Sequence, residues 1–422
     1  MMEGPRRPSE DMSPNPVSQP EVNIGLVGHI DHGKTTLTKA LSGVWADTHS
    51  EELKRGITIK LGYANTSFYK CPKEKGPKAF TTLNRCVACG GEAKLQRAVS
   101  FVDSPGHETL MATMLCGAAI MDGALLVVAA NEECPQPQTK EHLMALDIVG
   151  VKKIVVVQNK VDLVSREQVQ ENYEQIVQFL GEERAKTTPI IPISAQHSIN
   201  VDALIQAIET IIPTPKRDPS ADPRMHVARS FDVNRPGKHP SKLVGGVLGG
   251  ALVQGKLKIG DEIEIRPGIR HKVENKDVWE PLHTTVTTIT TGDKATKEVT
   301  PGGSFGIGTS LDPSLSKADS LSGNLVGFPG KLPPVLSTLD MDVTLLERVV
   351  GSKEEIAVEP ISPKELFMIN VGSATTVGVV VDKHKDHVRV ALKRPVCALE
   401  GERASLSRRF GARWRLIGYG VI

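Results

Sequence analysis

The sequence predicts an α/β domain followed by two all-β barrel domains. From Val22 to about Pro213, short apolar runs alternate with helix-forming segments. After Met225 the pattern changes to short strands separated by glycine-rich turns. A proline-rich stretch at 213–219 and a turn-rich stretch at 329–334 separate the three parts. We predict four segments: a disordered tail over 1–21, then domains over 22–216, 217–332 and 333–422.

The α/β part contains five apolar runs that suit buried strands. They are Val22–Val27, Val99–Val102, Ala124–Ala130, Ile154–Val157 and Ile190–Ile193. Predicted helices follow most of them, over 34–43, 107–119, 138–149, 166–180 and 201–212. Because crossovers between parallel strands are right-handed, we expect a parallel sheet with its ligand at the carboxyl edge.

A glycine-rich turn joins the first strand to the first helix. The stretch from Gly28 to Thr35 reads GHIDHGKT and fits the phosphate-loop pattern G-x-x-x-x-G-K-[ST]. Gly28 and Gly33 allow the backbone to point consecutive N–H groups at a β-phosphate, on the positive end of a helix. Lys34 would add a charge between the β- and γ-phosphates, and the Thr35 hydroxyl would ligate Mg²⁺. Taken alone, the pattern also fits a strand–helix turn that binds nothing.

Three further motifs follow predicted strands. Asp103 begins the motif Asp-Ser-Pro-Gly and is placed to approach Mg²⁺. The segment Asn159–Asp162 ends in a carboxylate that matches the N1–H and 2-amino donors of guanine, which adenine lacks. The segment Ser194–Gln196 can supply a backbone N–H to the guanine O6. Four motifs in this order, each at the carboxyl end of a strand, predict a guanine-nucleotide-binding domain, which makes the α/β part a P-loop GTPase domain.

The region after Met225 predicts the two barrels. Val244–Val253 and Ile263–Ile265 read as strands, with a turn at Pro267-Gly268. In the last part we predict strands over 341–345, 366–371, 376–381 and 387–392, with a turn at Lys385-Asp386.

Composition indicates a soluble globular protein. The 422 residues are 39% hydrophobic and 24% charged, with a net charge of +2. The longest apolar run, Ala124–Ala130, is too short to span a bilayer, and the N-terminus has no apolar signal core. We therefore expect a cytoplasmic protein without a membrane partner. A basic stretch near the C-terminus offers candidate RNA phosphate contacts, with a solvated basic face as the equal alternative: Arg394, Arg403, Arg408, Arg409, Arg413 and Arg415.

Several segments resemble a known family. The phosphate loop, Arg55–Ile59 and Asp103–His107 resemble the translational GTPases related to elongation factor Tu, whose plan is one GTPase domain and two β-barrels. Other segments are similar to the gamma subunit of archaeal and eukaryotic translation initiation factor 2. They are His49–Tyr63, Arg229–Gly237, Leu311–Asp319, Leu345–Gly351 and Arg413–Gly420. The likeness runs from about Val22 to the end.

This resemblance implies a function. Such a protein would carry methionylated initiator tRNA to the small ribosomal subunit, in a heterotrimer with an alpha and a beta subunit. GTP would maintain the tRNA-binding state, and hydrolysis to GDP and phosphate would end it. A related GTPase that delivers a specialised elongator tRNA is the main alternative. Two others are the GTPase partner of a sulfate-activating enzyme and a scaffold that binds GTP without turnover.

The resemblance also implies roles for individual residues. Mg²⁺ would be surrounded by Asp31, Thr35, Thr58 and the Gly56 carbonyl, with Asp103 acting through water. Catalytic roles fall to Lys34, Thr58, Gly106, whose N–H would sense the γ-phosphate, and His107, which would orient the attacking water. Together, the motifs and the resemblance give these GTP-binding residues: Asp31, His32, Gly33, Lys34, Thr35, Thr36, Asn159, Lys160, Asp162, Ser194, Ala195 and Gln196. Ile30 and Ile57 could form an apolar gate beside His107.

Cysteines offer half of a zinc site. Cys86-Val-Ala-Cys89 is a thiolate pair with a tight turn, and Cys71 lies upstream without a second cysteine three residues later. Glu74 could supply the fourth ligand, the site could bind zinc weakly, or the lobe could pack without metal. We expect packing roles for the other three cysteines, Cys116, Cys134 and Cys397. Asp47, His49, Glu51 and Glu52 read as exposed loop residues rather than a metal cluster.

Overall fold

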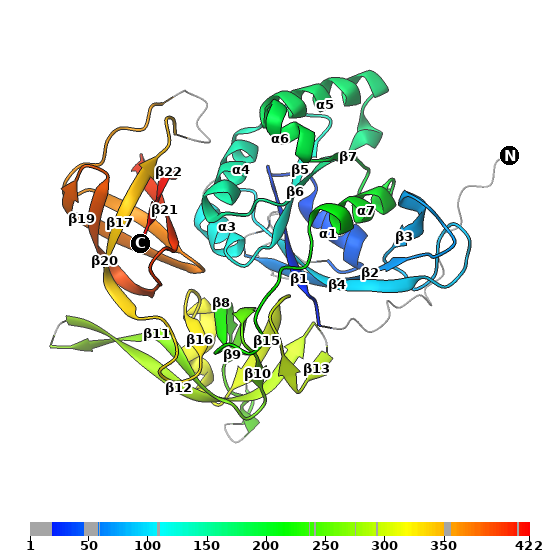
Figure 1. The fold of residues 1–422 in the computed structure, drawn as a ribbon. Coiled ribbons are helices and arrows are strands. Elements are labelled where there is room, and N and C mark those ends of the chain that lie inside the picture. The colour runs from blue at the N-terminus through cyan, green and yellow to red at the C-terminus, as the bar shows by residue number, and fades with distance from the viewer. Residues whose placement is uncertain are drawn as a thin grey trace.

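The protein has three bodies, which Figure 1 shows in a computed structural model. The structure describes residues 19–45, 58, 60–107, 110–235, 237–239, 242–274, 276–292, 294–349, 356–411 and 413–422. An α/β domain forms the upper right of Figure 1, one β-barrel lies below it, and a second β-barrel lies to the left. This is the predicted fold class, an α/β domain followed by two barrels.

The α/β domain is built on one seven-stranded sheet. Its order is β3-β2-β4-β1-β5-β6-β7. The strands are β1 (Val22–Gly28), β2 (Gly62–Lys70), β3 (Phe80–Thr81), β4 (Lys94–Asp103), β5 (Gly123–Ala129), β6 (Ile154–Asn159) and β7 (Ile190–Pro192). The five predicted strands are present and parallel. The sequence analysis missed β2 and β3, which extend the sheet in antiparallel pairing.

Helices cover both faces of this sheet (Figure 1). They are α1 (Lys34–Ser42), α3 (Met111–Ala118), α4 (Pro137–Val149), α5 (Arg166–Leu180), α6 (Glu182–Thr187) and α7 (Val201–Ile211), with 3₁₀ turns η1 (Pro77–Ala79) and η3 (Val161–Leu163). The helix expected from His107 begins at Met111 among the described residues. Helix α5 starts with a capping box, in which Ser165 and Gln168 exchange side-chain and backbone hydrogen bonds.

Two apolar cores lie on opposite faces of the sheet. Leu37 and Leu41 of α1 pack with Leu204 and Ile208 of α7 on one face. On the other face, residues of α3, α4 and α5 form a second core, which also includes Leu416 of the last barrel. Each buried aliphatic side chain stabilises the fold by about 1.5–3 kcal/mol relative to exposure. These cores hold the strand ends that carry the motifs in fixed positions.

The second body, barrel II, is a closed ring of six strands. Its order is β11-β16-β8-β9-β15-β12, and pairing of β11 with β12 closes it. The elements are β8 (Arg224–Phe231), β9 (Val247–Gln254), β10 (Leu257–Lys258), β11 (Glu262–Val273), β12 (Lys276–Thr291), β13 (Lys294–Thr296), β14 (Glu298–Val299), β15 (Phe305–Thr309), the 3₁₀ segment η5 (Pro313–Asp319) and β16 (Leu325–Gly327).

The turn predicted at Pro267-Gly268 is wrong. Strand β11 runs through this dipeptide, and the pairing with β12 shifts register between Ile265 and Ile269. Gly268 has φ +91°, and a Cβ there would lie 1.8 Å from the Glu280 carbonyl oxygen. The dipeptide is therefore a bulge inside a long hairpin, where backbone approach leaves room for glycine alone.

The third body, barrel III, is also closed. Its six strands follow the order β17-β20-β19-β18-β21-β22. They are β17 (Val335–Leu345), β18 (Leu366–Val371), β19 (Ala374–His384), β20 (His387–Cys397), β21 (Arg403–Phe410) and β22 (Arg413–Val421). The turn at Lys385-Asp386 is confirmed, whereas the arginine-rich strands β21 and β22 were missed. The domain boundaries at 216 and 332 stay predictions.

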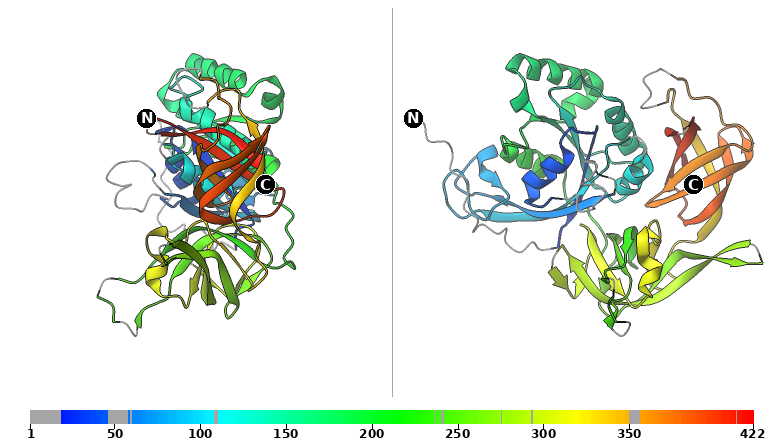
Figure 2. Two further views of the ribbon diagram at one scale, coloured as in Figure 1. Left: turned by 90° about the vertical axis from the view of Figure 1, so that its left-hand side faces the viewer. Right: turned by 180° about the vertical axis from the view of Figure 1, so that it is seen from behind.

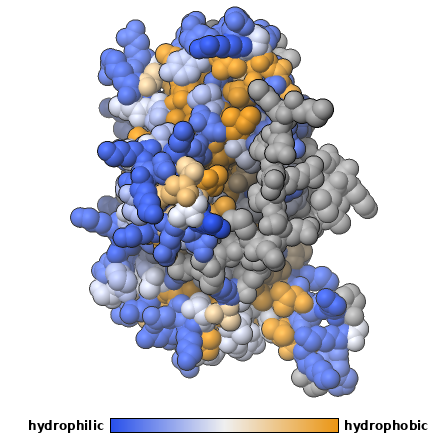
Figure 3. All heavy atoms as spheres, turned by 90° about the vertical axis from the view of Figure 1, so that its right-hand side faces the viewer, coloured by the Kyte–Doolittle hydropathy of each residue, from blue (hydrophilic) through white to orange (hydrophobic). Residues whose placement is uncertain are grey.

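Direct contacts join the three bodies. Cys116 of α3 places its Sγ 3.1 Å from Thr375 Oγ1 of barrel III. Asn23 of β1 accepts a hydrogen bond from Ser304 of barrel II at 3.1 Å. Figure 2 shows barrel II beneath the other two bodies from both directions, and Figure 3 shows hydrophilic side chains around most of the visible rim.

Within the described part of the chain, no helix is both long and apolar enough to cross a membrane.

Candidate functional site

The phosphate-loop sequence forms a tight turn at the carboxyl end of β1. Gly33 has φ +88°, and a Cβ there would lie 2.3 Å from Asn159 Nδ2. Asp31 also lies in the left-handed region, at φ +58°. Helix α1 begins at the next residue after Gly33, so its free N–H groups face the turn. The geometry is that of an anion-binding helix N-terminus.

Oxygen ligands gather at the start of α1. The Thr35 hydroxyl donates to Asp103 Oδ2 at 2.7 Å and lies 3.1 Å from Thr58 Oγ1. Thr58 and Asp103 are both buried. Hydroxyl and carboxylate oxygens are the ligands that Mg²⁺ prefers. The chemistry of this donor set fits the expected Mg²⁺, while the Gly56 carbonyl lies outside the described residues.

A cavity of about 230 Å³ opens beside these oxygens. The Lys34 ammonium lies at its edge and donates to the carbonyl oxygens of Gly28 and His29 at 3.0 and 2.6 Å. A Cβ on Gly106 would lie 2.6 Å from Lys34 Nζ, so this glycine permits close approach of the two loops. The lining residues are Ile30, Asp31, Gly33, Lys34, Thr35, Thr36, Trp45, Thr58, Gly106, His107 and Lys160. The structure thus brings the predicted phosphate-side residues that it describes to this cavity, apart from the buried His32, and Ile30 lines the same cavity as His107. Ile57, the other half of the predicted gate, falls outside the described residues.

Asn159 connects the guanine-side motifs to the phosphate loop. Its Nδ2 donates to the His32 carbonyl at 2.9 Å, and its Oδ1 accepts from the Ala195 N–H at 3.0 Å. The side chain is buried. Asp162 Oδ2 lies 3.5 Å from the ring of His197. The Asn159 amide therefore joins its own loop to the phosphate loop and to the Ala195 loop. Ser194 is buried beneath this edge and Gln196 is exposed on it.

Two histidines brace the phosphate loop from behind. His142 of α4 is buried, and its Nδ1 accepts a hydrogen bond from the Gly28 N–H at 2.8 Å. His32 is buried with its Nδ1 3.0 Å from the Val127 carbonyl oxygen. Burial lowers the pKa of His142 to about 3 and that of His32 to about 4, so both rings are neutral near pH 7. The sequence analysis missed His142, although its position on the apolar face of α4 was a signal.

Three of the cysteines form a separate cluster. The Sγ atoms of Cys71, Cys86 and Cys89 all lie within 4.8 Å of one another. Burial would raise the pKa of Cys71, but hydrogen bonds from the Lys73 N–H and from the neighbouring thiols lower it below its usual value. The Glu74 carboxylate is not part of this cluster in the described chain. Cys116 and Cys134 are half-buried and Cys397 is buried.

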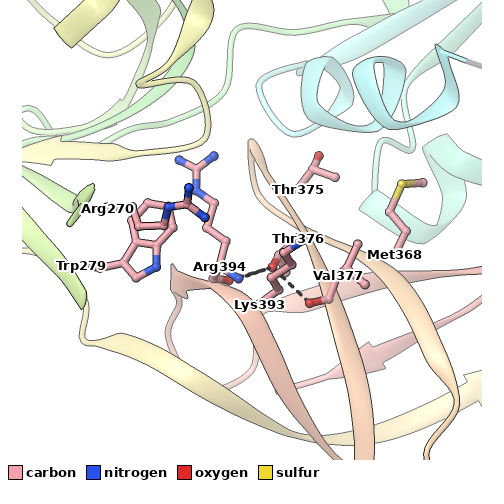
Figure 4. Close-up of a pocket in the computed structure, with 8 residues that line it drawn as sticks. All are labelled: Arg270, Trp279, Met368, Thr375, Thr376, Val377, Lys393 and Arg394. Carbon is pink, nitrogen blue, oxygen red and sulfur yellow. Dashed lines mark hydrogen bonds between the residues drawn. The ribbon is translucent and has the colours of Figure 1, made fainter. Parts of the chain in front are cut away.

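Arg394 lies in a second cavity, between the two barrels and close to α3. Its guanidinium carbon is 5.4 Å from the Trp279 ring centroid, and it donates to the Ser322 carbonyl at 2.9 Å. Figure 4 shows the guanidinium beside the indole. The cavity measures about 260 Å³ and is lined by Arg270, Trp279, Met368, Thr375, Thr376, Val377, Lys393 and Arg394.

Other members of the basic stretch also bind protein groups. Arg415 of β22 pairs with Glu141 of α4 at 2.5 Å, and both are buried. Arg403 reaches backbone carbonyls at the end of α4, and Arg408 pairs with Glu365 inside barrel III. Of the six arginines considered as RNA contacts, these three and Arg394 therefore hold the fold together.

Two family models match separate parts of the chain, the α/β domain and barrel III. A family model described as the elongation factor Tu GTP binding domain matches residues 19–214. A second model, initiation factor eIF2 gamma, C terminal, matches residues 337–422. The chain is 62% identical over 405 residues to translation initiation factor 2 subunit gamma of Methanothermobacter thermautotrophicus, covering 96% of this chain and 99% of that protein. The chain belongs to the translation initiation factor 2 gamma subunit family.

A second relative with the same name, from Archaeoglobus fulgidus, is 61% identical over 406 residues, covering 96% of this chain and 95% of that protein. As a member of the gamma subunit family, with the matching GTP-binding domain, the chain is a GTPase of the translation apparatus. The predicted family and GTPase class are confirmed.

Solved structures support the fold. A bacterial selenocysteine-specific elongation factor superposes with a TM-score of 0.71 at 23% identity, over 95% of this chain and 58% of that chain. The elongation factor SelB from Methanococcus maripaludis, in complex with the GTP analogue GppNHp, gives a TM-score of 0.70 at 23% identity, over 97% and 80% of the two chains. At this identity the likeness concerns the fold alone.

Proposed function

We propose that this chain is a GTP-dependent carrier of methionylated initiator tRNA, which it delivers to the small ribosomal subunit in the cytoplasm. The observation that carries the proposal is 62% identity to a translation initiation factor 2 gamma subunit across 96% of the chain, both barrels included. GTP binding defines the carrying state, and hydrolysis to GDP and phosphate ends it.

The nucleotide would be held by loops that the fold already braces. Backbone N–H groups from Asp31 to Thr36 bind the phosphates, and Lys34 supplies positive charge. The Asp162 carboxylate would accept from the guanine N1–H and 2-amino group. Asn159 and the Ala195 loop would fix the distance between the base and the phosphates. Mg²⁺ would be held by Asp31, Thr35 and Thr58, with Asp103 acting through water, and would neutralise charge on the phosphate oxygens.

Hydrolysis would depend on positioning rather than on a covalent intermediate. His107 orients a water toward the γ-phosphate, and Gly106 offers its N–H to a γ-phosphate oxygen. Thr58 approaches the same phosphate from the other side, so its loop responds to hydrolysis. Ile30 lines the same cavity as His107 and would restrict its approach until the ribosome binds.

The gamma subunit would work with an alpha and a beta subunit in a heterotrimer. The relatives are named as the gamma subunit of translation initiation factor 2, and this supports the assembly. The barrels are large closed modules outside the nucleotide site, and they offer surface for both subunits and for tRNA.

Zinc binding by the cysteine cluster is a second part of the proposal. Three Sγ atoms lie within 4.8 Å of one another, so they could supply three of the four ligands of a tetrahedral zinc site. The fourth position would fall to water or to a rearranged Glu74. The metal would stabilise the cysteine-bearing insertion, residues 70–91, because it would link Cys71 to Cys86 and Cys89 and its binding free energy would add to the free energy of folding.

The experiment that tests the function is tRNA binding under matched nucleotide conditions. Methionylated initiator and methionylated elongator tRNA are each titrated against the chain, with a GTP analogue and with GDP, with and without the two partner subunits. Tight binding of the initiator species that requires the GTP analogue is expected. Preference for an elongator tRNA would support the alternative carrier, and binding independent of nucleotide would overturn the switch.

A further inference from the structure

Strands β18 and β19 present one of their faces to the outside of barrel III. Directly opposed residues of paired strands share a face. Three opposed pairs follow one another on the outer face: Asn370 with Thr375, Met368 with Val377, and Leu366 with Val379. Helix α3 covers the first pair, since Cys116 Sγ lies 3.1 Å from Thr375 Oγ1. Beyond that pair the face continues away from α3 toward solvent.

The part of this face that α3 leaves uncovered is aliphatic. Leu366 is 53% exposed, Val379 is 37% exposed, and Val381, the next outward residue of β19, is 56% exposed. The inward residues of the same strands form the core of barrel III, so the exposed side chains belong to a well-packed sheet. A contiguous apolar patch on such a sheet marks an interaction site more often than scattered apolar residues do. We define the aliphatic strip by its five members, Leu366, Met368, Val377, Val379 and Val381.

Two guanidinium groups lie at the end of the aliphatic strip nearest α3. Arg270 and Trp279 are directly opposed in the β11–β12 hairpin, so their side chains share a face. Arg394 of β20 lies over the indole, with its guanidinium carbon 5.4 Å from the ring centroid. Figure 4 shows these three side chains on one side of the cavity, with Met368 and Val377 on the other. The aliphatic strip therefore runs into the cavity of about 260 Å³ that holds both cations.

The positive charge of this cavity is poorly balanced. Its lining residues, all within the described part of the chain, include no Asp or Glu. Burial lowers the pKa of Arg394, and the groups that oppose this are the thiols of Cys116 and Cys397. Arg394 Nε is buried without a hydrogen-bond acceptor among the described residues. Arg270 contacts Asp277 at 3.4 Å, longer than the roughly 2.7–2.9 Å of a strong charge-assisted bond. A carboxylate brought by a partner would meet two guanidinium groups there.

We propose that the aliphatic strip and this cavity form a docking surface for an extended segment of a partner protein. The segment alternates aliphatic and polar residues and places carboxylates in the cavity. Outward residues of β19 repeat about every 6.7 Å, and an extended peptide presents alternate side chains at the same spacing. Its aliphatic side chains pack on Val377, Val379 and Val381, and its carboxylates accept hydrogen bonds from Arg270 and Arg394. None of these residues lines the nucleotide cavity, so the proposal is independent of the carrier function.

The lining of this surface favours a peptide over RNA. Single-stranded RNA binds mainly through stacking of its bases on open aromatic faces and through several phosphate contacts. Among the described lining residues of the cavity, Trp279 is the one aromatic side chain, and Arg394 lies over its ring. The aliphatic strip offers no further stacking surface. Aliphatic packing beside a small number of cations therefore suits an acidic, apolar peptide.

The test is binding of a fluorescein-labelled peptide to the full chain, followed by fluorescence anisotropy. The probe is Ile-Ser-Val-Ser-Leu-Asp-Asp, which alternates aliphatic and polar residues and ends in carboxylates. Binding with a dissociation constant below about 1 mM is expected. Replacing both aspartates by asparagine should weaken binding about fivefold or more, because the charge-assisted hydrogen bonds are lost. The rearranged peptide Ile-Val-Leu-Ser-Ser-Asp-Asp, which lacks the alternation, should weaken it by a similar factor.

Variants of the chain locate the peptide. Arg270→Met and Val379→Ser each alter an exposed side chain of the proposed surface and should weaken binding about fivefold or more. The matched controls are Arg184→Met on α6, which removes an exposed guanidinium, and Val87→Ser in the cysteine-bearing insertion, where the side chain is 79% exposed. Both controls should bind the peptide normally. Circular dichroism of the four variants verifies that each is folded.

Several results would overturn the proposal. They are no binding of the peptide up to about 1 mM, equal binding of the asparagine peptide, and equal losses in the test and control variants. Binding of oligouridylate that Arg270→Met weakens, without binding of the peptide, would assign the surface to RNA instead. A dimer in light scattering that Val381→Asp converts to a monomer would assign the aliphatic strip to a second copy of the chain.

Discussion

His142 Nδ1 accepts a hydrogen bond from the Gly28 N–H, so a neutral ring on helix α4 supports the first glycine of the phosphate loop. The adjacent residue, Glu141, pairs with Arg415 of barrel III. One turn of helix therefore contacts the nucleotide loop on one side and the last barrel on the other.

Acidification should destabilise the protein from about pH 6.5 downward. The pKa of His142 is lowered to about 3 and that of His32 to about 4, from the ordinary 6.5. In that window the unfolded chain binds protons that the folded chain does not, so the free energy of unfolding falls as the pH drops. The slope approaches about 1.4 kcal/mol per pH unit for each histidine. Urea denaturation at several pH values measures it, and His142→Gln should show a smaller slope. An equal slope in the variant would contradict the assignment.

Asn159→Asp should weaken both GDP and GTP binding. The acceptor for the Ala195 N–H remains, but the donor to the His32 carbonyl becomes an oxygen facing an oxygen. An unmade buried hydrogen bond costs about 1–3 kcal/mol, which corresponds to roughly five- to 150-fold in affinity. Titration with fluorescent nucleotides measures the loss. Gln170→Ala, which breaks an exposed side-chain contact to Glu174, is the matched control and should bind normally.

Thr58→Ala should slow GTP hydrolysis and leave GDP affinity nearly unchanged. The hydroxyl lies 3.1 Å from Thr35 Oγ1, in the oxygen cluster expected to hold Mg²⁺. Its removal takes away a ligand that matters when the γ-phosphate is present, so the expected loss in single-turnover rate is about tenfold or more. Thr210→Ala, on the exposed side of α7, serves as control. A normal rate in Thr58→Ala would reject the role given to Thr58.

Arg415→Met should destabilise the protein by about 3–5 kcal/mol. The substitution removes the guanidinium that Glu141 contacts in a buried site, and removal of one partner of a buried ion pair typically costs this much. Adding Glu141→Leu should restore much of the stability, because the charge is then absent. Chemical denaturation of Arg415→Met, of Glu141→Leu and of the double variant measures both effects. Additive losses would show that the two residues act independently.

Purified protein should contain about one zinc per chain, and Cys86→Ser should abolish it. The thiols of Cys71, Cys86 and Cys89 are close enough to share one ion. Chelation should raise the hydrogen exchange of the insertion and spare the nucleotide site. Cys134→Ser, outside this cluster, is the control. Zinc content far below one per chain in the parent would support packing without metal.

The residues that line the candidate nucleotide cavity were predictable because the spacing within each motif is local. Each motif follows a strand that apolar residues alone identify, and parallel strands bring those ends together. His142 was missed because its place on the apolar face of α4 indicated burial but not the contact with Gly28, which lies 114 positions away. The hydrogen bond between Gly28 and His142 forms only when helix α4 packs against the sheet.

The errors in the barrels have a different physical origin. Pro267-Gly268 has the composition of a turn, yet a long hairpin accommodates it as a bulge. Strand β21 carries three arginines, which suggested an exposed face, but Arg403 and Arg408 find protein partners instead. The hydrogen bond between Lys60 and Asp319 joins residues 259 positions apart, and it forms only where barrel II packs against the α/β domain.

Strand β22 has a consequence for biosynthesis. It pairs with both β17 and β21 and so closes barrel III, and it carries the Arg415 that reaches α4. The α/β domain and barrel II leave the ribosome earlier and can fold as units. Until residues 413–421 emerge, the third barrel is an open sheet whose edges can pair with other chains. A released chain that is truncated before that strand would therefore carry a folded nucleotide site beside an aggregation-prone edge.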